Sequence, residues 1–432
     1  MTRPQVVILG GGFAGLAAAR QLGERYAVTL IDRGADFEFL PNLHELVSRA
    51  KKPASLRLQR SRLVTRHGHV FRQAEVVAID PERRRLRTGD GGELAYDALV
   101  VATGSAVAGR RVPGAAEHAL PLRSIANGVE IGARLRQLAA AGAPRAVTVV
   151  GGGFTGVECL GEILRRYRQR GALAIRMIEP RRLLAGQPRA VHRALRQVIG
   201  ECDVELFLGE SVAGLEPGWI TLASGSRLRS DLTLWTAGGG PPPLLAEAGL
   251  APAGEWAPAR GSLQSGAYDD VFIAGDSAEL RRAVHRQSYQ ATAMGRRAAK
   301  NAARLLTGRE PKPYSPPDDQ LLVTFGYLSG FYIDDDVVLE GAALCLAREL
   351  LFQIGMAELD RPRRAGAHRR LLRRIRDAAR LGSLPAPLRS LLPFPFARTP
   401  RDRFDLPSLP RLVKLRGARP SLDAAAGEVR LA

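Results

Sequence analysis

Two glycine-rich loops of nearly identical sequence are the residues of this chain whose types and spacing best suit a chemical role. The first reads GGGFAG at residues 10–15, and the second reads GGGFTG at residues 151–156. Each loop follows a short apolar run and opens a stretch with the character of a helix. A strand, a tight glycine turn and a helix, in that order, form the pyrophosphate site of dinucleotide-binding proteins. The two loops therefore predict two bound dinucleotides.

Each glycine in such a loop has its own task. The first permits a sharp turn, the second lets the backbone approach the pyrophosphate, and the third lets the helix pack closely on the strand. The helix N-terminus then offers N–H groups and a partial positive charge to the phosphates. These positions are Gly10, Gly12 and Gly15 in the first loop, and Gly151, Gly153 and Gly156 in the second.

An acidic residue ends the second predicted strand of each unit. Asp32 follows the apolar run 28–31, and Glu179 follows the run 174–178. A carboxylate at this place accepts hydrogen bonds from the ribose hydroxyls of a dinucleotide and disfavours a 2′-phosphate. Arg181 and Arg182 complicate the second site, because a phosphate favours arginine.

The elements that must position these residues alternate between strand and helix, which favours parallel sheets. Strands are expected at 5–9, 28–31, 99–101, 147–150, 174–178, 232–237 and 271–274, and helices at about 13–24, 154–169 and 287–306. The fold class is therefore α/β, with two Rossmann-like domains, the second inserted in the first. We expect a first domain at 1–115 and 265–335, a second at 116–264, and a C-terminal basic, amphipathic helical region at 336–432.

Composition limits the other possibilities. The chain has 432 residues, of which 45% are hydrophobic, enough for two or three cores. The first strand starts near Met1, and no apolar run reaches the length of a bilayer span, so we expect neither a signal peptide nor a membrane-spanning helix. The three cysteines and seven histidines are dispersed, which predicts a reducing, cytoplasmic location and no metal site.

The formal charge of +20 is concentrated in one segment. Residues 361–419 contain 17 Arg or Lys residues against three Asp residues. A helix is expected at 337–359, and a basic amphipathic stretch with arginines around an apolar face follows at 369–380. Exposed Leu and Phe beyond it, between 388 and 396, suit the surface of an anionic membrane. The alternatives are a helix docked on the protein itself and a nucleic-acid-binding or protein-binding arm on a protein with no turnover of its own. Aromatic residues are not interleaved with the arginines, so we expect no nucleic-acid partner.

An ordered set of motifs gives this chain a more specific resemblance. The set comprises the two loops, Asp32, FLPNLHE at 39–45, ATG at 102–104, Glu179, WTAG at 235–238, Gly275-Asp276 and the helix MGRRAAKN at 294–301. Over roughly residues 5–335 the chain resembles flavoproteins with two dinucleotide-binding domains, and among them the type II NADH dehydrogenases. Members of that family are single-chain NADH:quinone oxidoreductases of the membrane surface.

The resemblance implies that the first domain binds FAD and the second binds NADH. The implied FAD contacts are Gly10, Gly12, Gly15, Asp32, Thr103, Gly104, Gly275 and Asp276, and the implied NADH contacts are Gly151, Gly153, Gly156, Glu179 and Gly238. Glu158 would lie near the nicotinamide, where it helps position the hydride donor. The first loop has Ala17 at the corresponding place. A helix-dipole role for the acid is the simpler alternative.

The predicted site of the electron acceptor is where this chain departs from the family pattern. Family members carry glutamines at the quinone site on the helix after Gly-Asp, and this chain has Tyr289 and Ala293 at the aligned positions. Gln290 is the substitute that we expect to act there. Cys159 and Cys345 fall near the cysteine positions of sulfide:quinone oxidoreductases, so sulfide oxidation and a ferredoxin-type reductase remain alternatives. The sequence also leaves the oligomeric state open, a homodimer included.

Overall fold

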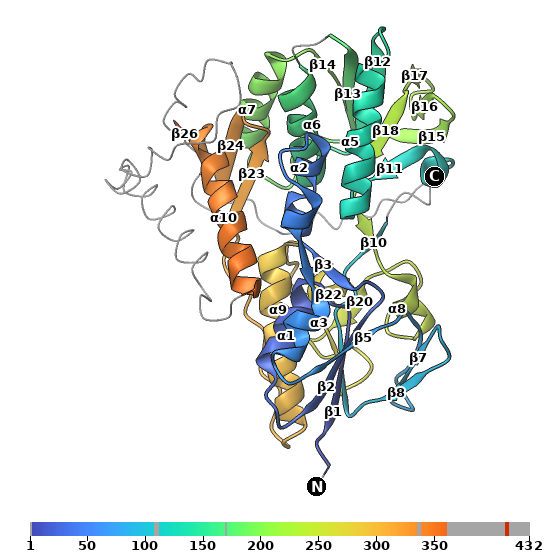
Figure 1. The fold of residues 1–432 in the computed structure, drawn as a ribbon, viewed down its shortest axis with the longest axis vertical. Helices are drawn as coiled ribbons and strands as arrows, with labels where there is room; N and C mark the ends of the chain where they lie inside the picture. The colour runs from blue at the N-terminus through green and yellow to red at the C-terminus, as the bar shows by residue number, and fades with distance from the viewer. Residues whose placement is uncertain (1, 108–111, 169–170, 335–337, 361–410, 414–432) are drawn as a thin grey trace. The chain divides into compact units, whose positions relative to one another are not determined.

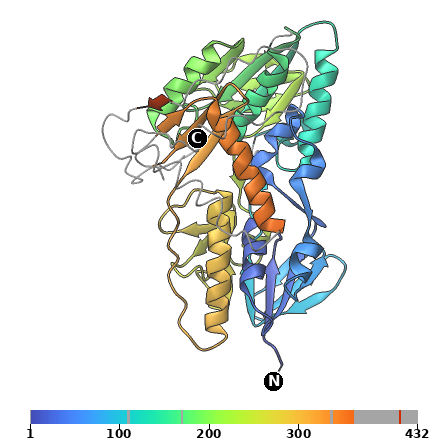
Figure 2. The same cartoon turned by 60° about the vertical axis from the view of Figure 1, so that its left-hand side comes forward.

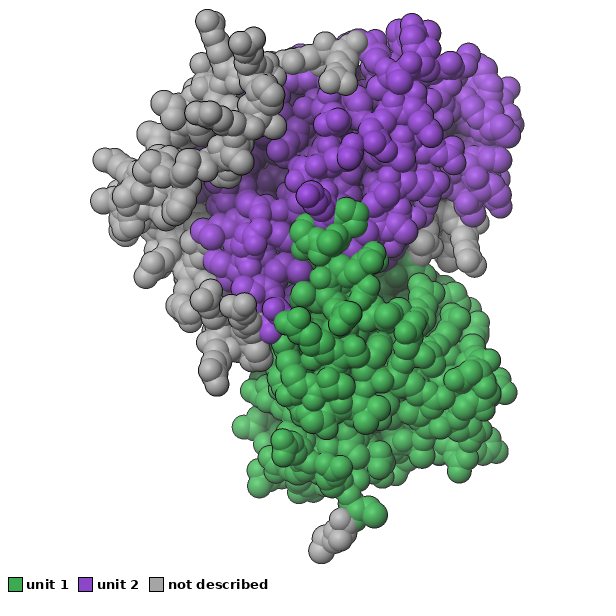
Figure 3. Space-filling view, in the orientation of Figure 1, with its two compact units in different colours: residues 1–41, 53–108, 238–317 green, residues 42–52, 109–237, 318–432 purple. Residues whose placement is uncertain are grey.

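The computed structural model describes residues 2–107, 112–168, 171–334, 338–360 and 411–413. Contacts between residues divide the chain into two units, coloured separately in Figure 3. The first unit comprises residues 1–41, 53–108 and 238–317, and the second comprises 42–52, 109–237 and 318–432. These limits differ from the domain boundaries expected from the sequence. Residues 238–264 group with the first unit, whereas segment 42–52 and the residues after 317 group with the second.

The first unit is built on a parallel five-stranded sheet in the order β21-β9-β1-β2-β5 (Figure 1). The strands are β1 (Gln5–Leu9), β2 (Ala27–Asp32), β5 (Val70–Gln73), β9 (Ala98–Val101) and β21 (Val271–Ile273). β1 is central, because Val6 pairs with Val28 on one side and Ala98 on the other. Apolar side chains fill β1, β9 and β21 because both faces of a parallel sheet are covered, whereas the edge strand β5 is more exposed.

Helices α1 (Phe13–Gln21) and α9 (Ser288–Leu305) pack against each other on this sheet. Their approach is close, since a Cβ atom on Gly295 would lie 2.0 Å from the carbonyl oxygen of Ala14. The predicted helix at 13–24 therefore exists but ends earlier, and the predicted helix at 287–306 is confirmed as α9. The remaining elements of the first unit are β3 (Asp36–Glu38), β4 (Arg57–Gln59), α3 (Arg60–Thr65), β6 (Val76–Asp80), β7 (Arg85–Thr88), β8 (Glu93–Ala95), β10 (Ala106–Val107), β19 (Gly239–Gly240), α8 (Pro243–Glu247), β20 (Ala257–Ala259), η3 (Gly275–Ser277) and β22 (Ala278–Leu280).

The second unit repeats the pattern with a parallel sheet in the order β11-β18-β12-β13-β14. Its strands are β11 (Ala119–Pro121), β12 (Arg145–Val150), β13 (Leu173–Glu179), β14 (Val204–Leu208) and β18 (Leu232–Trp235). Helices α5 (Ile125–Ala139), α6 (Phe154–Tyr167) and α7 (Arg189–Gly200) accompany the sheet, and β15 (Val212–Glu216), β16 (Trp219–Leu222) and β17 (Arg227–Arg229) form a small antiparallel sheet. Both predicted Rossmann-like cores are thus confirmed.

Segment 42–52 joins the second unit although the residues on both sides of it belong to the first. It contains helix α2 (His44–Val47), which packs against α5 and α6. Glycines on α5 make room for it, because a Cβ atom on Gly132 would lie 3.0 Å from the carbonyl oxygen of Leu46.

The second unit also contains an antiparallel sheet of β23 (Leu321–Phe325), β24 (Ser329–Ile333), β25 (Val338–Glu340) and β26 (Arg411–Val413). Helix α10 (Ala343–Asp360) runs beside β24, as the orange elements of Figure 2 show. The continuous helix expected at 337–359 is therefore wrong over its first part, where β25 lies instead. Gly341 ends the strand at φ +154°, and its carbonyl accepts a hydrogen bond of 3.1 Å from the Gly330 N–H.

Two further expectations concern the membrane. The amphipathic stretch at 369–380 and the apolar run after it lie outside the described residues. Within the part of the chain that the structure describes, every helix is too short or too polar to cross a bilayer.

Candidate functional site

The first glycine loop lies between β1 and α1, and its backbone explains two of the three glycines. Gly10 has φ +101°, and a Cβ atom there would lie 2.4 Å from the carbonyl oxygen of Ala102. A Cβ atom on Gly15 would lie 1.8 Å from the carbonyl oxygen of Gly10. At Gly12, by contrast, it would meet nothing within 4 Å. Gly12 therefore borders open space at the start of α1, where no side chain caps the helix.

Asp32 joins this loop to the end of β2. Its carboxylate accepts a 2.7 Å hydrogen bond from the Gly11 N–H and a 2.8 Å bond from the Gly34 N–H. Arg60 lies beside it, with Nη1 3.3 Å from Oδ1. A carboxylate has about four acceptor positions, so Asp32 can hold the loop and still accept a ribose hydroxyl.

The other predicted FAD residues also lie in the first unit. The hydroxyl of Thr103 is buried without a hydrogen-bond partner in the described structure, which is unusual for a buried polar atom. Gly104 has φ +69° and Gly275 has φ +80°. Asp276 lies on η3 and lines a small cavity with Gln290 and Met294. The open space at Gly12, the uncapped helix and the orphaned hydroxyl suit a dinucleotide such as FAD.

The second loop has the same geometry. Gly151 has φ +105°, and a Cβ atom on Gly156 would lie 1.8 Å from the Gly151 carbonyl oxygen. At Gly153 a Cβ atom would again meet nothing within 4 Å, and α6 begins without a side-chain cap. Glu179 accepts a 2.7 Å hydrogen bond from the Gly152 N–H and a 3.0 Å bond from the Arg181 N–H.

Gly238 differs from the other predicted NADH residues, because it groups with the first unit, directly before β19. Its φ of +71° favours glycine there. The structure thus explains the glycine by the backbone conformation before β19, and its contact with NADH stays a prediction.

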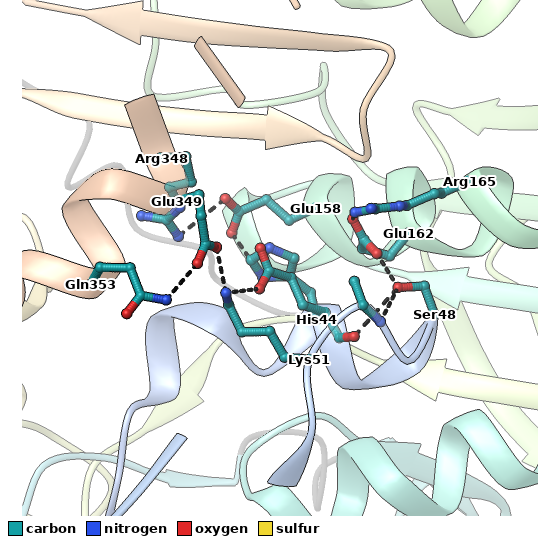
Figure 4. Close-up of polar contacts among 11 residues, drawn as sticks. His44, Ser48, Lys51, Glu158, Glu162, Arg165, Arg348, Glu349 and Gln353 are labelled. Carbon is teal, nitrogen blue, oxygen red and sulfur yellow. Dashed lines mark hydrogen bonds and ion pairs between the residues drawn. The ribbon is translucent and has the colours of Figure 1, made fainter. Parts of the chain in front are cut away.

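Glu158 lies on α6 at the centre of a buried polar cluster in the second unit (Figure 4). One carboxylate oxygen, Oε2, is 3.5 Å from Nδ1 of His44 on α2. The other, Oε1, is 3.3 Å from Nη2 of Arg348 on α10 and accepts a 3.4 Å bond from the Thr324 N–H. Residues from α2, β23 and α10, which are distant in sequence, therefore meet at the carboxylate of Glu158.

The electrostatics of this cluster favour proton exchange near neutral pH. Burial raises the pKa of Glu158 to about 7, while Arg348 acts in the opposite direction. Burial, reinforced by Arg348 and Lys51, holds the pKa of His44 well below its usual value. His44 is therefore neutral at pH 7, and Arg348 is the cation that pairs with Glu158.

Neighbouring polar contacts fasten segment 42–52 to the rest of the second unit. The Ser48 hydroxyl donates to Glu162, and Arg165 Nη1 lies 3.4 Å from the same carboxylate. Lys51 pairs with Glu45 at 3.2 Å and with Glu349 on α10.

Of the residues in this cluster, Glu158 was predicted from the sequence. His44 belongs to the motif at 39–45, but the sequence assigned it no role. Arg348 was missed, because no local pattern connects it with a residue 190 positions earlier.

Gln290 on α9 is 2% exposed, and both ends of its amide are engaged. Nε2 donates to the carbonyl of Pro317 at 3.0 Å, and Oε1 accepts from the Tyr314 hydroxyl at 2.8 Å. These bonds fasten the segment after α9, so the structure gives Gln290 a structural task. A contact with the electron acceptor stays a prediction.

The cysteines give no support for sulfide chemistry. Cys159 is fully buried, and burial raises the pKa of its thiol far above the usual range. Burial also raises the pKa of Cys345 to about 12, and its thiol donates to the Gly326 carbonyl at 3.5 Å. Both are free thiols. Because the thiolate is the reactive form, neither is poised to attack a sulfur substrate.

Comparison with known proteins agrees with this geometry. Residues 4–299 match the family profile of the pyridine nucleotide-disulphide oxidoreductases. A demethylphylloquinone reductase from Synechocystis sp. is 32% identical over 377 residues, which cover 81% of this chain and 91% of the relative. A type II NADH:quinone oxidoreductase from Staphylococcus aureus is 23% identical over 82% of this chain and 96% of its own length.

Among solved structures, the sulfide:quinone oxidoreductase of Aquifex aeolicus superposes with a TM-score of 0.74. The match covers 83% of this chain and 91% of that chain at 20% identity. At that identity the likeness establishes the fold alone, because one fold supports several chemistries.

Proposed function

This chain belongs to the pyridine nucleotide-disulphide oxidoreductase family, on its type II NADH dehydrogenase branch, and we propose that it oxidises NADH, with FAD as bound cofactor, and reduces a quinone. The observation that carries the proposal is the pair of glycine loops with the same geometry, one in each unit. A single loop would serve a protein that binds one dinucleotide, whereas electron transfer from NADH to a flavin requires two.

The proposed division of residues follows the two units. In the first unit the FAD ligands are Gly10, Gly12, Gly15, Asp32, Thr103, Gly104, Gly275 and Asp276. In the second the NADH ligands are Gly151, Gly153, Gly156 and Glu179, with Gly238 added from the first. When bound, FAD supplies a group that accepts a hydride from a nicotinamide and passes two electrons to a quinone.

The chain itself contributes orientation and a site for a proton. Each loop directs backbone N–H groups at a pyrophosphate, and each strand-end carboxylate binds a ribose. Glu158 can hold or release a proton near pH 7, and the reaction of NADH with a quinone consumes one proton per quinol formed. Gln290 is proposed as an acceptor contact, supported by its place in the wall of the cavity beside Asp276.

Steady-state assays of the purified FAD-loaded protein test the function. We expect NADH oxidation with short-chain ubiquinone, menaquinone or naphthoquinone analogues, weaker oxidation of NADPH, and no flavin reduction by sulfide. Burial raises the pKa of both the Cys159 and the Cys345 thiol, which predicts the last result. Rapid reduction of the flavin by sulfide, with none by NADH, would contradict the proposal.

We also propose that the protein attaches to a membrane surface from the cytoplasmic side through residues 365–400. This rests on the arginines and apolar residues of that sequence, which lies outside the described structure. The quinones in the names of both relatives support a location where a lipid-soluble acceptor is available. A homodimer is the oligomer we would test first by light scattering.

A further inference from the structure

The two glycine loops differ in the group that binds the carbonyl oxygen of the middle glycine of GGG, which is Gly11 in the first loop and Gly152 in the second. In the first loop Nε of Arg60 donates to the carbonyl of Gly11 at 2.9 Å. In the second loop the backbone N–H of Leu184 donates to the carbonyl of Gly152 at 2.8 Å. A charged guanidinium thus occupies, in the first unit, the place of a neutral backbone donor in the second.

Arg60 is the first residue of α3, and it binds two turns at once. Besides the carbonyl of Gly11, it reaches the carbonyl of Gly34 through Nη1 at 2.8 Å. Asp32 accepts hydrogen bonds from the N–H groups of the same two glycines. The planar guanidinium and the planar carboxylate, 3.3 Å apart, therefore tie both peptide groups into one closed network.

Two glycines pack closely against the Arg60 side chain of this network. A Cβ atom on Gly11 would lie 2.5 Å from Nε of Arg60, and one on Gly34 would lie 2.8 Å from Nη1. The Arg60 side chain is only 11% exposed, and that of Asp32 is 17% exposed. The glycines at these positions make space for the arginine.

We propose that Arg60 is a positioning residue that retains FAD in the first site by holding Asp32 and the Gly11 peptide in their binding geometry. The inference rests on the proposed function, in which FAD stays bound while NADH exchanges. Preorganisation lowers the entropy lost on binding. The positive charge of Arg60 also offsets the repulsion between the Asp32 carboxylate and a nearby pyrophosphate. The second loop has an acid at the corresponding place, Glu179, and the same turn, but a neutral donor, as suits a substrate that must leave.

The direct test is the rate at which FAD leaves the full-length protein, followed by the recovery of flavin fluorescence after dilution. Arg60→Met should release FAD between about 10-fold and 100-fold faster than wild type, which is the range for losing hydrogen bonds to charged groups. Arg60→Lys keeps the charge but cannot bind both carbonyls through a planar fork, so an intermediate rate is expected. The Michaelis constant for NADH, measured at saturating FAD, should stay within about twofold of wild type.

Two controls separate this role from general loss of stability. Arg57→Gln breaks an exposed ion pair with Asp36 in the same unit, where the atoms are 3.4 Å apart, and should leave FAD release unchanged. In an Asp32→Asn background, Arg60→Met should accelerate release by much less than in wild type, because the two residues act as one unit.

The proposal is overturned if Arg60→Met releases FAD at the rate of Arg57→Gln, if Arg60→Lys matches wild type, or if the effects of Asp32→Asn and Arg60→Met simply multiply. Should Arg60→Met fail to fold, as melting of the apoprotein would reveal, the Arg60→Lys rate decides. Absence of flavin reduction by NADH in wild type would instead contradict the proposed function, because the release measurement needs only bound FAD.

Discussion

Within each GxGxxG loop the second and third glycines of the pattern differ in what lies opposite their Cα atoms. Gly15 and Gly156 face backbone atoms of their own loop, whereas Gly12 and Gly153 face open space. The first pair therefore serves the fold, and we expect the second pair to serve the ligand. The sequence pattern could name all four, but it could not separate these tasks, because the separation depends on what lies opposite each Cα atom.

Substitutions at Gly12 and Gly15 should have opposite signatures. Gly15→Ala places a Cβ atom 1.8 Å from a backbone oxygen, so α1 must shift, and the free energy of unfolding of the apoprotein should fall by about 1–3 kcal/mol. A Cβ atom at Gly12 meets no protein atom within 4 Å, and Gly12 has an ordinary backbone conformation, with φ −82°. Gly12→Leu is therefore tolerated by the backbone. It should change apoprotein stability by less than about 0.5 kcal/mol and yet abolish FAD binding. Melting curves and flavin content measure the two effects, and normal flavin content in Gly12→Leu would contradict the assignment of the first site.

Arg348 should control the pH at which Glu158 titrates. Its charge favours the carboxylate, so Arg348→Met should raise the pKa of Glu158 further above about 7. The midpoint of the pH profile for flavin reduction by NADH should then move to higher pH, whichever form of Glu158 is the active one. Arg348→Lys should restore the wild-type midpoint.

A matched variant on the same helix separates charge from packing. Glu349→Gln weakens the Lys51 contact between segment 42–52 and α10 without touching Glu158. Its pH profile should keep the wild-type midpoint. An equal displacement in Glu349→Gln and Arg348→Met would show that docking of α10, and not the Arg348 charge, sets the titration.

At the scale of elements, the sequence predicted strands best where the apolar run is followed by a glycine turn. The runs before Gly10, Gly104, Gly151 and Gly275 became β1, β9, β12 and β21, because a buried parallel strand is an apolar run that a glycine turn ends. The apolar-rich run 337–359 predicts one continuous helix from the sequence alone. Gly341 divides it into a strand and a helix, and the pairing of β25 with β24 decides the outcome.

Two features of the site could not be predicted at this scale. Segment 42–52 reads as a short loop with a helical turn, and its membership of the second unit depends on glycines of α5 that make room for it. Arg348 reads as a single arginine on an apolar helix, with nothing in the local sequence to identify its partner. Its partner is fixed only when α10 docks beside β24 and α6.

Helix α10 should be needed for the second unit, whereas the chain after it should not. Leu344 packs with Leu322, Tyr332 and Leu339, and Arg348 covers Glu158. A chain ending at residue 341 should therefore melt at a lower temperature than a chain ending at residue 360. The chain ending at 360 loses the pairing of β26 with β25 but should keep FAD and NADH-dependent reduction of a soluble dye. Equal melting temperatures for the two truncated chains would contradict the packing described for α10.

At the scale of the whole molecule, the charge of +20 should govern where the protein resides. Each basic side chain near an anionic leaflet contributes on the order of 1 kcal/mol, reduced by screening at physiological salt. Buried Leu and Phe add a part that salt does not remove, at about 25 cal/mol per Å². Full-length protein should therefore sediment with anionic vesicles, less at high salt than at low salt. Without sedimentation at low salt, the proposed membrane attachment fails.

The claim that two dinucleotides exchange a hydride in this chain is tested most directly by anaerobic titration of the FAD-loaded protein with NADH. We predict that the flavin absorbance bleaches with one NADH per FAD, and that a quinone analogue restores it. Glu179→Ala should raise the NADH concentration that is needed to bleach the flavin, while the amount of bound FAD stays the same. A flavin that NADH leaves oxidised, in protein that retains FAD, would contradict the account.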